Sequence, residues 1–167
     1  MSWLRSATEV PTPFEGVLGL RPELLSLYRD LYGKLWADPL VPPALLELCR
    51  LRIASWHDCE AERGIRHATA GVTAAQIVAL DDWHTADCFT ACERAALTIA
   101  DKMCGQVHDV SDEDVAAVRQ HLSDAQTVAL MLALGLFDAQ CRVRLALGVV
   151  PKPVTVDAPA SAHGMIY

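Results

Sequence analysis

The chain has 167 residues, a formal net charge of −7, and 52% hydrophobic but only 6% aromatic residues. A chain of this length can form one domain with a substantial core, and the scarcity of aromatic residues indicates that Ala, Leu and Val build it. The negative charge argues against binding to nucleic acid or to an anionic membrane, because both require a basic face.

Helix start signals follow one another along most of the chain. Residues 1–20 are punctuated by Pro and Gly and predict an irregular N-terminal arm. Pro22 opens a stretch with apolar residues at helical spacing, and Pro42 and Pro43 open a second one. Four capping-box patterns predict the starts of later helices: Thr73 with Gln76, Thr90 with Glu93, Ser111 with Asp114 and Ser123 with Gln126. The last helix should run from about Asp124 to Leu147 and end at Gly148.

These signals predict an all-α protein, because no stretch alternates as a strand does. We expect one helical domain over residues 21–149 and a C-terminal tail over 150–167, disordered or lying on a neighbouring subunit. The apolar run from Val128 to Phe137 is too short to span a bilayer and predicts a buried helix.

The beginning of the chain lacks the long apolar region of a secretory signal, so we expect a cytoplasmic protein. In the reducing cytoplasm most of the six cysteines should be small buried hydrophobic side chains, in particular Cys49, Cys104 and Cys141.

The stretch SWHDCEAERGIRH, residues 55–67, carries the densest group of reactive side chains. If a helix begins near Cys59, then Glu62 and Arg66 share one of its faces with the thiol. The helix N-terminus and Arg66 would lower the pKa of the thiol, whereas Asp58, Glu60 and Glu62 would raise it. The alternative is an ordinary ion pair between Glu62 and Arg66 on a solvated face.

The longer stretch LLELCRLRIASWHDCEAERGIRHATAGVTAAQIVAL resembles the central motif of the carboxymuconolactone decarboxylase and alkyl hydroperoxidase D-like family, and the resemblance extends over residues 23–149. In the redox branch of that family the motif is Glu, eleven residues, then CxxCxxxH. The resemblance implies an alkyl hydroperoxidase D-like helical bundle that assembles into a homo-oligomer, as a dimer, trimer or hexamer.

Carried over residue by residue, Glu47 matches the acidic proton-relay position and Cys59 matches the first cysteine. Glu62 stands in place of the second cysteine, and Arg66 stands in place of the relay histidine. His67 is a poor substitute, because a shift of one residue turns a helical side chain by about 100°. A family Asn-Arg pair near the end of the last helix falls on Cys141 and Arg142.

The resemblance implies three alternative functions. The first is a cofactor-free, lyase-type enzyme that transfers protons on a small carbonyl or lactone-type substrate. The residues for this chemistry would be the acid/base candidates Glu47, Glu62 and His57, with Cys59 as a pocket thiol, and the substrate-binding candidates Arg66, Arg52 and Trp56.

The second alternative is a one-cysteine, peroxiredoxin-like oxidoreductase in which Cys59 attacks a peroxide. Because Glu62 cannot resolve a sulfenic acid, another thiol would have to do so, from Cys49, Cys88 or a small molecule. The third alternative is a non-catalytic binding or scaffold member of the family.

We expect no metal site. His84, Cys88 and Cys92 have the spacing of one helical face, but the capping box at Thr90 begins a helix after Cys88 and breaks the stripe.

Overall fold

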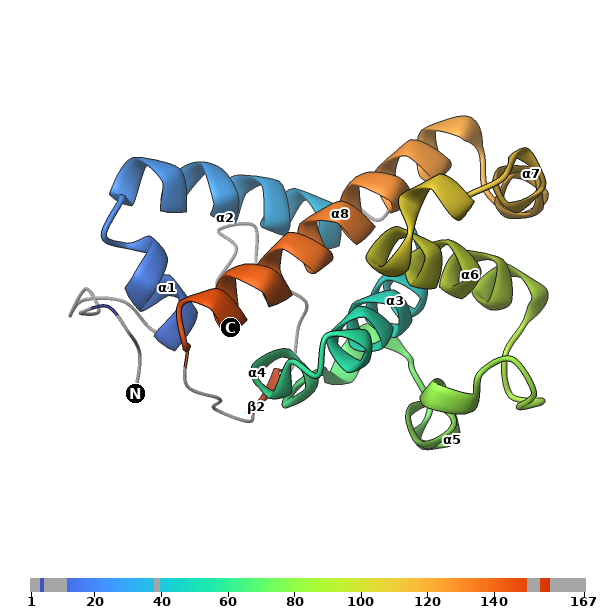
Figure 1. The fold of residues 1–167 in the computed structure, drawn as a ribbon, viewed down its shortest axis with the longest axis horizontal. Coiled ribbons are helices and arrows are strands. Elements are labelled where there is room, and N and C mark those ends of the chain that lie inside the picture. Colours follow the sequence, from blue (N-terminus) through green and yellow to red (C-terminus); the bar gives the residue numbers. More distant parts are fainter. Residues whose placement is uncertain (1–3, 5–11, 38–39, 150–153, 157–167) are drawn as a thin grey trace.

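The structure is a computed structural model that describes residues 4, 12–37, 40–149 and 154–156. Within these residues the fold is helical apart from two strands of three residues (Figure 1). The helices are α1 (Pro13–Leu18), α2 (Pro22–Ala37), α3 (Pro43–Trp56), α4 (Glu60–Arg63), α5 (Ala74–Val78), α6 (Ala91–Gly105), α7 (Asp112–Arg119) and α8 (Asp124–Ala146). The strands are β1 (Ile65–His67) and β2 (Val154–Val156). The prediction of an all-α fold is confirmed.

Helix α3 is the centre of the packing. Buried residues lie on all of its sides, as is typical of a helix surrounded by other elements, and it packs against α6 and α8. Helix α2 runs beside α8 (Figure 1) and contacts it through aromatic rings, with the centroids of Trp36 and Phe137 6.1 Å apart. Residues of α3 therefore face several elements at once.

The helix starts predicted from the four capping boxes and the predicted end of the last helix agree with the structure. All four capping boxes are present. In each, the Ser or Thr side chain accepts a hydrogen bond from the backbone N–H three residues later, and the side chain of that later residue accepts one from the Ser or Thr backbone N–H. Helix α8 ends as predicted: Gly148 adopts a left-handed φ of 61°, and the Val149 N–H donates to the Arg144 carbonyl oxygen at 2.9 Å. This is the Schellman geometry that favours glycine.

The predicted N-terminal arm is wrong for residues 13–18, which form α1. The Thr12 hydroxyl accepts a hydrogen bond from the Glu15 N–H at 3.2 Å, and Phe14 and Val17 are buried. So short a helix is stabilised by packing rather than by its length. Residues 1–3 and 5–11 of the predicted arm lie outside the described part.

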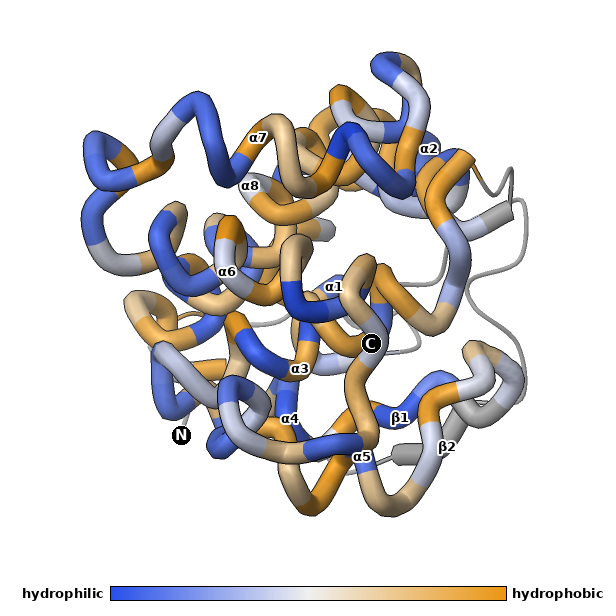
Figure 2. The backbone as a smooth tube through the Cα atoms, turned by 90° about the vertical axis from the view of Figure 1, so that its right-hand side faces the viewer, coloured by the Kyte–Doolittle hydropathy of each residue, from blue (hydrophilic) through white to orange (hydrophobic). Residues whose placement is uncertain are grey.

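The strand pair was also not predicted. Strands β1 and β2 are parallel, with Ile65 opposite Val154 and His67 opposite Val156. Figure 2 shows the pair toward the lower side of the molecule, and in Figure 1 β2 lies beside α4, which also contacts β1. Residues 154–156 of the predicted tail are therefore paired within the same chain. The other residues assigned to the tail lie outside the described part.

No helix in the part of the chain that the structure describes has the length and apolar character needed to cross a membrane.

Candidate functional site

A tight turn after α3 places Cys59 at the start of α4. The Asp58 N–H donates to Ser55 at 3.0 Å and the Cys59 N–H donates to Ala54 at 2.8 Å, which closes a second Schellman turn. Asp58 occupies the left-handed position of this turn with a φ of 50°. Cys59 is thereby held as the N-cap residue of α4 and is 1% exposed.

The prediction that Cys59, Glu62 and Arg66 share one helical face is wrong. Helix α4 ends at Arg63, and Arg66 lies in β1. The Arg66 guanidinium donates to the carbonyl oxygens of Arg63 and Ile65, the latter at 2.9 Å. Because the chain leaves the helix after one turn, Arg66 does not pair with Glu62.

Glu62 instead belongs to a buried charge cluster, which consists of Glu47, Arg50, Glu62 and Arg144. Arg50 binds Glu47 through two hydrogen bonds, with Nε–Oε2 and Nη2–Oε1 distances of 2.8 and 2.9 Å. Its Nη1 donates to Glu62 Oε2 at 2.8 Å. On the other side of Glu62, Arg144 Nε lies 2.5 Å from Oε1. All four residues are at most 3% exposed.

The four formal charges of the buried charge cluster cancel. Buried charges are tolerated when they are paired and hydrogen-bonded, and the planar guanidinium suits such pairing. Both oxygens of Glu62 contact an arginine. Both oxygens of Glu47 accept from Arg50, and Oε1 also accepts from the His67 backbone N–H at 3.1 Å. The two carboxylates therefore join α3, α4, β1 and α8.

Arg50 and Arg144 were missed in the sequence, although a signal for Arg144 exists. The buried residues of α8 recur at helical spacing, including Leu130, Leu134, Phe137 and Cys141, and Arg144 continues that stripe one turn further. A charged residue on the apolar face of an amphipathic helix predicts a buried partner of opposite charge.

A pocket of about 240 Å³ lies between the two Schellman turns. It is lined by Asp58, Cys59, Glu60, Ala61, Arg144, Leu145, Gly148 and Val149. Glu47 and Glu62 are absent from this lining. A small molecule in the pocket would meet the Cys59 thiol and the Arg144 side chain.

Cys141 of α8 contacts Cys59 through a hydrogen bond between the two side chains. This bond lowers the pKa of Cys59 to about 7, against the opposing effect of burial, and the backbone N–H of Glu62 also lowers it. The same bond, together with burial, raises the pKa of Cys141. Cys59 is therefore the member of the pair that ionises first, while Cys141 keeps its proton.

Comparison with known families matches this part of the chain. Residues 22–102, which include Glu47, Cys59 and Glu62, match the model of the carboxymuconolactone decarboxylase family. Over these residues the chain is similar to that family. The shared region ends before α8, so Cys141 and Arg144 lie outside it.

A solved structure extends the likeness to most of the chain. It is a protein of unknown function from Agrobacterium tumefaciens, described as a proposed antioxidant defence protein AhpD, with a TM-score of 0.70 and 18% identity over 81% of this chain and 95% of that chain. This similarity shows the alkyl hydroperoxidase D-like fold. No curated protein is significantly similar to the chain in sequence.

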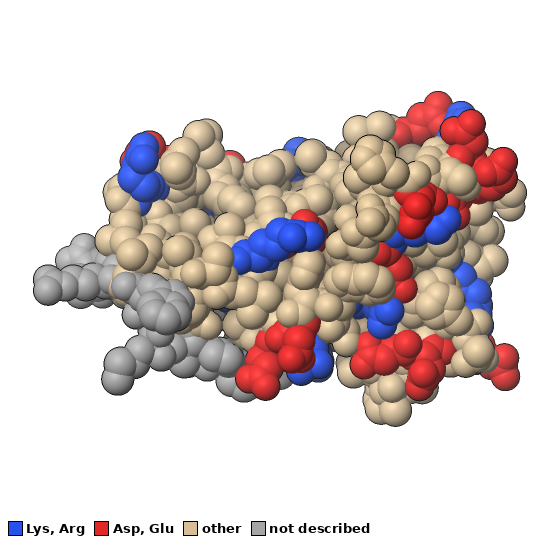
Figure 3. All heavy atoms as spheres, viewed as in Figure 1, with Lys and Arg blue, Asp and Glu red and all other residues tan. Residues whose placement is uncertain are grey.

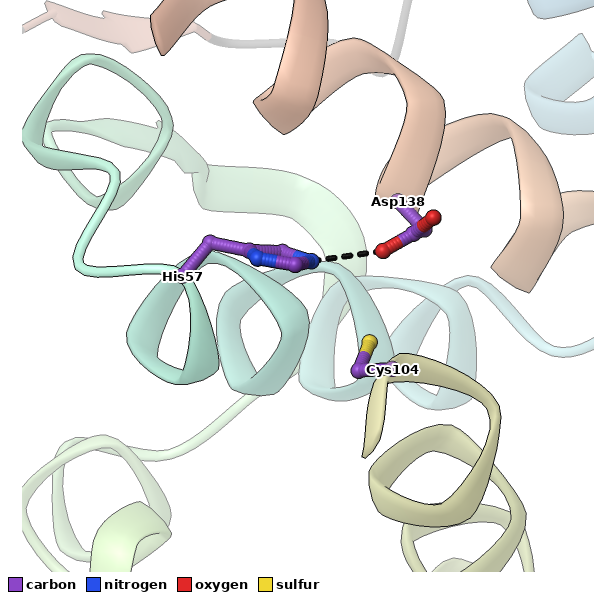
Figure 4. Close-up of side chains that lie close together, drawn as sticks. All are labelled: His57, Cys104 and Asp138. Carbon is purple, nitrogen blue, oxygen red and sulfur yellow. Dashed lines mark hydrogen bonds and ion pairs between the residues drawn. The ribbon is translucent and has the colours of Figure 1, made fainter. Parts of the chain in front are cut away.

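His57, one of the acid/base candidates from the sequence, lies with Cys104 and Asp138 in one group (Figure 4). Their nitrogen, sulfur and oxygen atoms all lie within 4.8 Å of one another, a donor set that zinc accepts. Each group already has a protein partner: the Asp138 oxygens bind His57 Nε2 at 2.5 Å and Arg142 Nε at 2.8 Å. Burial, with Asp138 nearby, raises the pKa of Cys104 to about 12, which keeps the thiol protonated. Hydrogen bonding among these side chains accounts for the arrangement.

The two other substrate-binding candidates lie away from the pocket that Cys59 lines. Arg52 binds both oxygens of Asp101 at 2.6 and 3.0 Å and Asp81 at 3.1 Å. Trp56 is 47% exposed, and the guanidinium of Arg52 lies 5.8 Å from its ring centroid. Arg52 therefore connects α3 to α6, and Trp56 packs against Arg52 within α3.

His67 links the buried charge cluster to α2 and should make stability depend on pH. Its ring stacks on Trp36 at 4.3 Å, and burial lowers its pKa from 6.5 to about 3. Between these values only the unfolded chain binds the proton, so stability is full above pH 6.5 and falls as the pH decreases. We expect the free energy of unfolding to fall by about 2 kcal/mol between pH 6.5 and 5 from this residue alone.

The variant His67→Phe keeps an aromatic ring against Trp36 and has no proton to bind. Urea unfolding at pH 6.5 and pH 5 should therefore show that the variant loses about 2 kcal/mol less free energy of unfolding than the wild type. Equal losses in the two proteins would contradict the assignment of this pH dependence to His67.

Proposed function

We propose that the protein is a thiol-dependent, peroxidase-type oxidoreductase in which the Cys59 thiolate reduces a small hydroperoxide. The observation that carries the proposal is a thiol with a pKa of about 7 on the lining of a pocket. The thiolate is the reactive form of cysteine, and near pH 7 about half of such a group is ionised. The solved structure with the same fold is described as a proposed antioxidant defence protein, which names the same class of chemistry.

In the proposed step the Cys59 sulfur attacks the terminal oxygen of the hydroperoxide. The O–O bond breaks, the alkoxide leaves and takes up a proton to become the alcohol, and Cys59 becomes a sulfenic acid. Arg144 lines the same pocket, and its Nη2 has no hydrogen-bond partner within the described residues. Its positive charge can stabilise the departing alkoxide.

Acid/base catalysis by Glu47 or Glu62 is less well supported by the geometry. A general acid or base must reach the proton that it transfers. The carboxylates of Glu47 and Glu62 are held by arginines and do not line the pocket, and His57 Nε2 is bound to Asp138. Cys59 is the reactive group that faces the pocket.

The expected result for Cys59→Ser is loss of peroxide consumption to the rate seen without protein, because no other thiol replaces the nucleophile. The rate at which iodoacetamide labels wild-type Cys59 should rise with pH with a midpoint near pH 7. Mass spectrometry of the tryptic peptide 53–63 measures this labelling. Cys88→Ser, which removes an exposed thiol, serves as the control and should behave as wild type. Unchanged peroxide consumption by Cys59→Ser would disprove the proposal.

The proposed reaction suits the reducing cytoplasm. All six cysteines are free thiols in the structure, and a dithiol reductant of that compartment would restore Cys59.

We further infer that the protein assembles with copies of itself through α2. Leu24, Leu27 and Leu31 lie on one face of this helix at 50%, 66% and 38% exposure. Figure 3 shows that the molecular face over α2 carries few charges, whereas charged groups gather over the opposite end. Burial of such a leucine stripe against a second copy would remove its apolar surface from water.

Leu27→Asp is expected to dissociate this homo-oligomer, because it would bury a charge in the interface. Multi-angle light scattering of the full chain measures the mass directly. Val78→Asp is the control, because Val78 is 87% exposed on α5 and should not change the mass. The same mass for wild type and Leu27→Asp would exclude α2 as the interface.

A further inference from the structure

We propose that Cys141 is the resolving cysteine of the Cys59 reaction, so that each turnover forms a disulfide between the start of α4 and the C-terminal part of α8. This inference rests on the proposed function. Cys141, from another helix, would supply the second thiol that the motif lacks because Glu62 occupies its position.

Two contacts hold the α4 and α8 segments together. Cys59 and Cys141 share a side-chain hydrogen bond. Three residues further along each segment, Glu62 Oε1 and Arg144 Nε lie 2.5 Å apart. The ion pair therefore keeps α8 against α4 one helical turn beyond the two cysteines. A disulfide requires such a close approach of the two segments.

The other thiols have different surroundings. The charged and polar groups that change the pKa of Cys49 are Asp101, Cys92, Glu93 and Cys104. Cys104 in turn makes a side-chain hydrogen bond with Asp138. Cys88 is exposed. The side chain with the largest effect on the pKa of Cys59 is Cys141. Cys49 and Cys88, the two thiols considered from the sequence, are not among the main groups that change this pKa.

The pocket separates the roles of the two cysteines. Both are 1% exposed, but Cys59 lines the pocket and meets the peroxide, whereas Cys141 is absent from the lining. Substrate therefore reaches Cys59 only, and Cys141 reacts after Cys59 has been oxidised. Such a pair also limits further oxidation of the sulfenic acid, because its partner is already in contact.

The resolving step balances without another oxidant. The Cys141 sulfur attacks the Cys59 sulfur of the sulfenic acid, the S–S bond forms, and the S–O bond breaks. The departing hydroxide takes the proton of the Cys141 thiol and leaves as water. One hydroperoxide and two thiols thus give one alcohol, one water and one disulfide. An external dithiol then reduces the disulfide by exchange at Cys59, which is the sulfur that the pocket reaches.

The experiment treats the reduced, full-length protein with one equivalent of hydrogen peroxide, blocks the remaining thiols with iodoacetamide, and maps tryptic peptides. The wild type should lose two thiols for each peroxide consumed and should yield a cross-link between peptides 53–63 and 120–142. Cys141→Ser should lose one thiol and accumulate a Cys59 sulfenic acid that dimedone traps. Cys104→Ser, which removes a different buried thiol, should give the wild-type cross-link.

The outcomes separate this inference from the proposed function. If peroxide leaves Cys59 unmodified in the wild type, the proposed function fails. If Cys59 forms a sulfenic acid in the wild type that persists without a cross-link to Cys141, the peroxidase proposal stands and the inference on Cys141 is overturned. The mapping of the wild-type protein needs no variant, so the result does not depend on the folding of Cys141→Ser.

Discussion

Replacement of Arg50 by Met is expected to lower the free energy of unfolding by about 3–5 kcal/mol. Arg50 is the only residue of the buried charge cluster that binds both carboxylates, and it is 1% exposed. Met fills much of the same space, so the loss comes from two buried carboxylates without their shared counterion. The Arg50 Nη2 bond to the Ile65 carbonyl at 2.8 Å is lost as well.

Urea unfolding at neutral pH measures the effect, and two variants make it specific. Arg119→Met removes an arginine from a surface pair with Asp124, where the side chains are 56% and 79% exposed, and should cost about 0–1 kcal/mol. Glu47→Gln in the Arg50→Met background should recover part of the loss, because one unpaired charge is removed. An Arg50→Met protein as stable as the Arg119→Met protein would show that the cluster contributes little to folding.

The second large effect is expected for Glu62→Cys, which restores the CxxC spacing. The sequence suggests a gain of redox chemistry, but the structure predicts a loss of about 3–5 kcal/mol in the free energy of unfolding. The Glu62 carboxylate is the counterion of both Arg50 and Arg144, and a neutral thiol at this position would leave a net positive charge in the core.

The matched control is Glu60→Cys, which places a thiol in the same turn at an exposed position and should change stability little. Glu62→Gln separates charge from shape, because its amide oxygen still accepts one hydrogen bond; its loss should be smaller than that of Glu62→Cys. A Glu62→Cys protein with wild-type stability and a disulfide between residues 59 and 62 would refute this view of Glu62.

The sequence predicted the helices well because their signals are local. A capping box acts over three residues, proline opens a helix at its own position, and Gly148 ends α8 through its own left-handed conformation. The interactions that form these boundaries involve neighbours along the chain.

The predicted helix through Arg66 failed because β1 begins at Ile65 by pairing with Val154 near the end of the chain. A contact over such a separation leaves no pattern in the three residues concerned. The same holds for α1, in which burial of Phe14 and Val17 decides the structure of a segment that reads as irregular.

The sequence by itself determined the fold class and the family resemblance, because these follow from periodic spacing and a contiguous motif. Only the tertiary structure decided that Glu62 is the counterion of Arg50 and Arg144 and that Cys141 contacts Cys59. The physical reason is that burial makes each charge depend on its partners, and those partners come from α3, α4 and α8, which are joined only by folding.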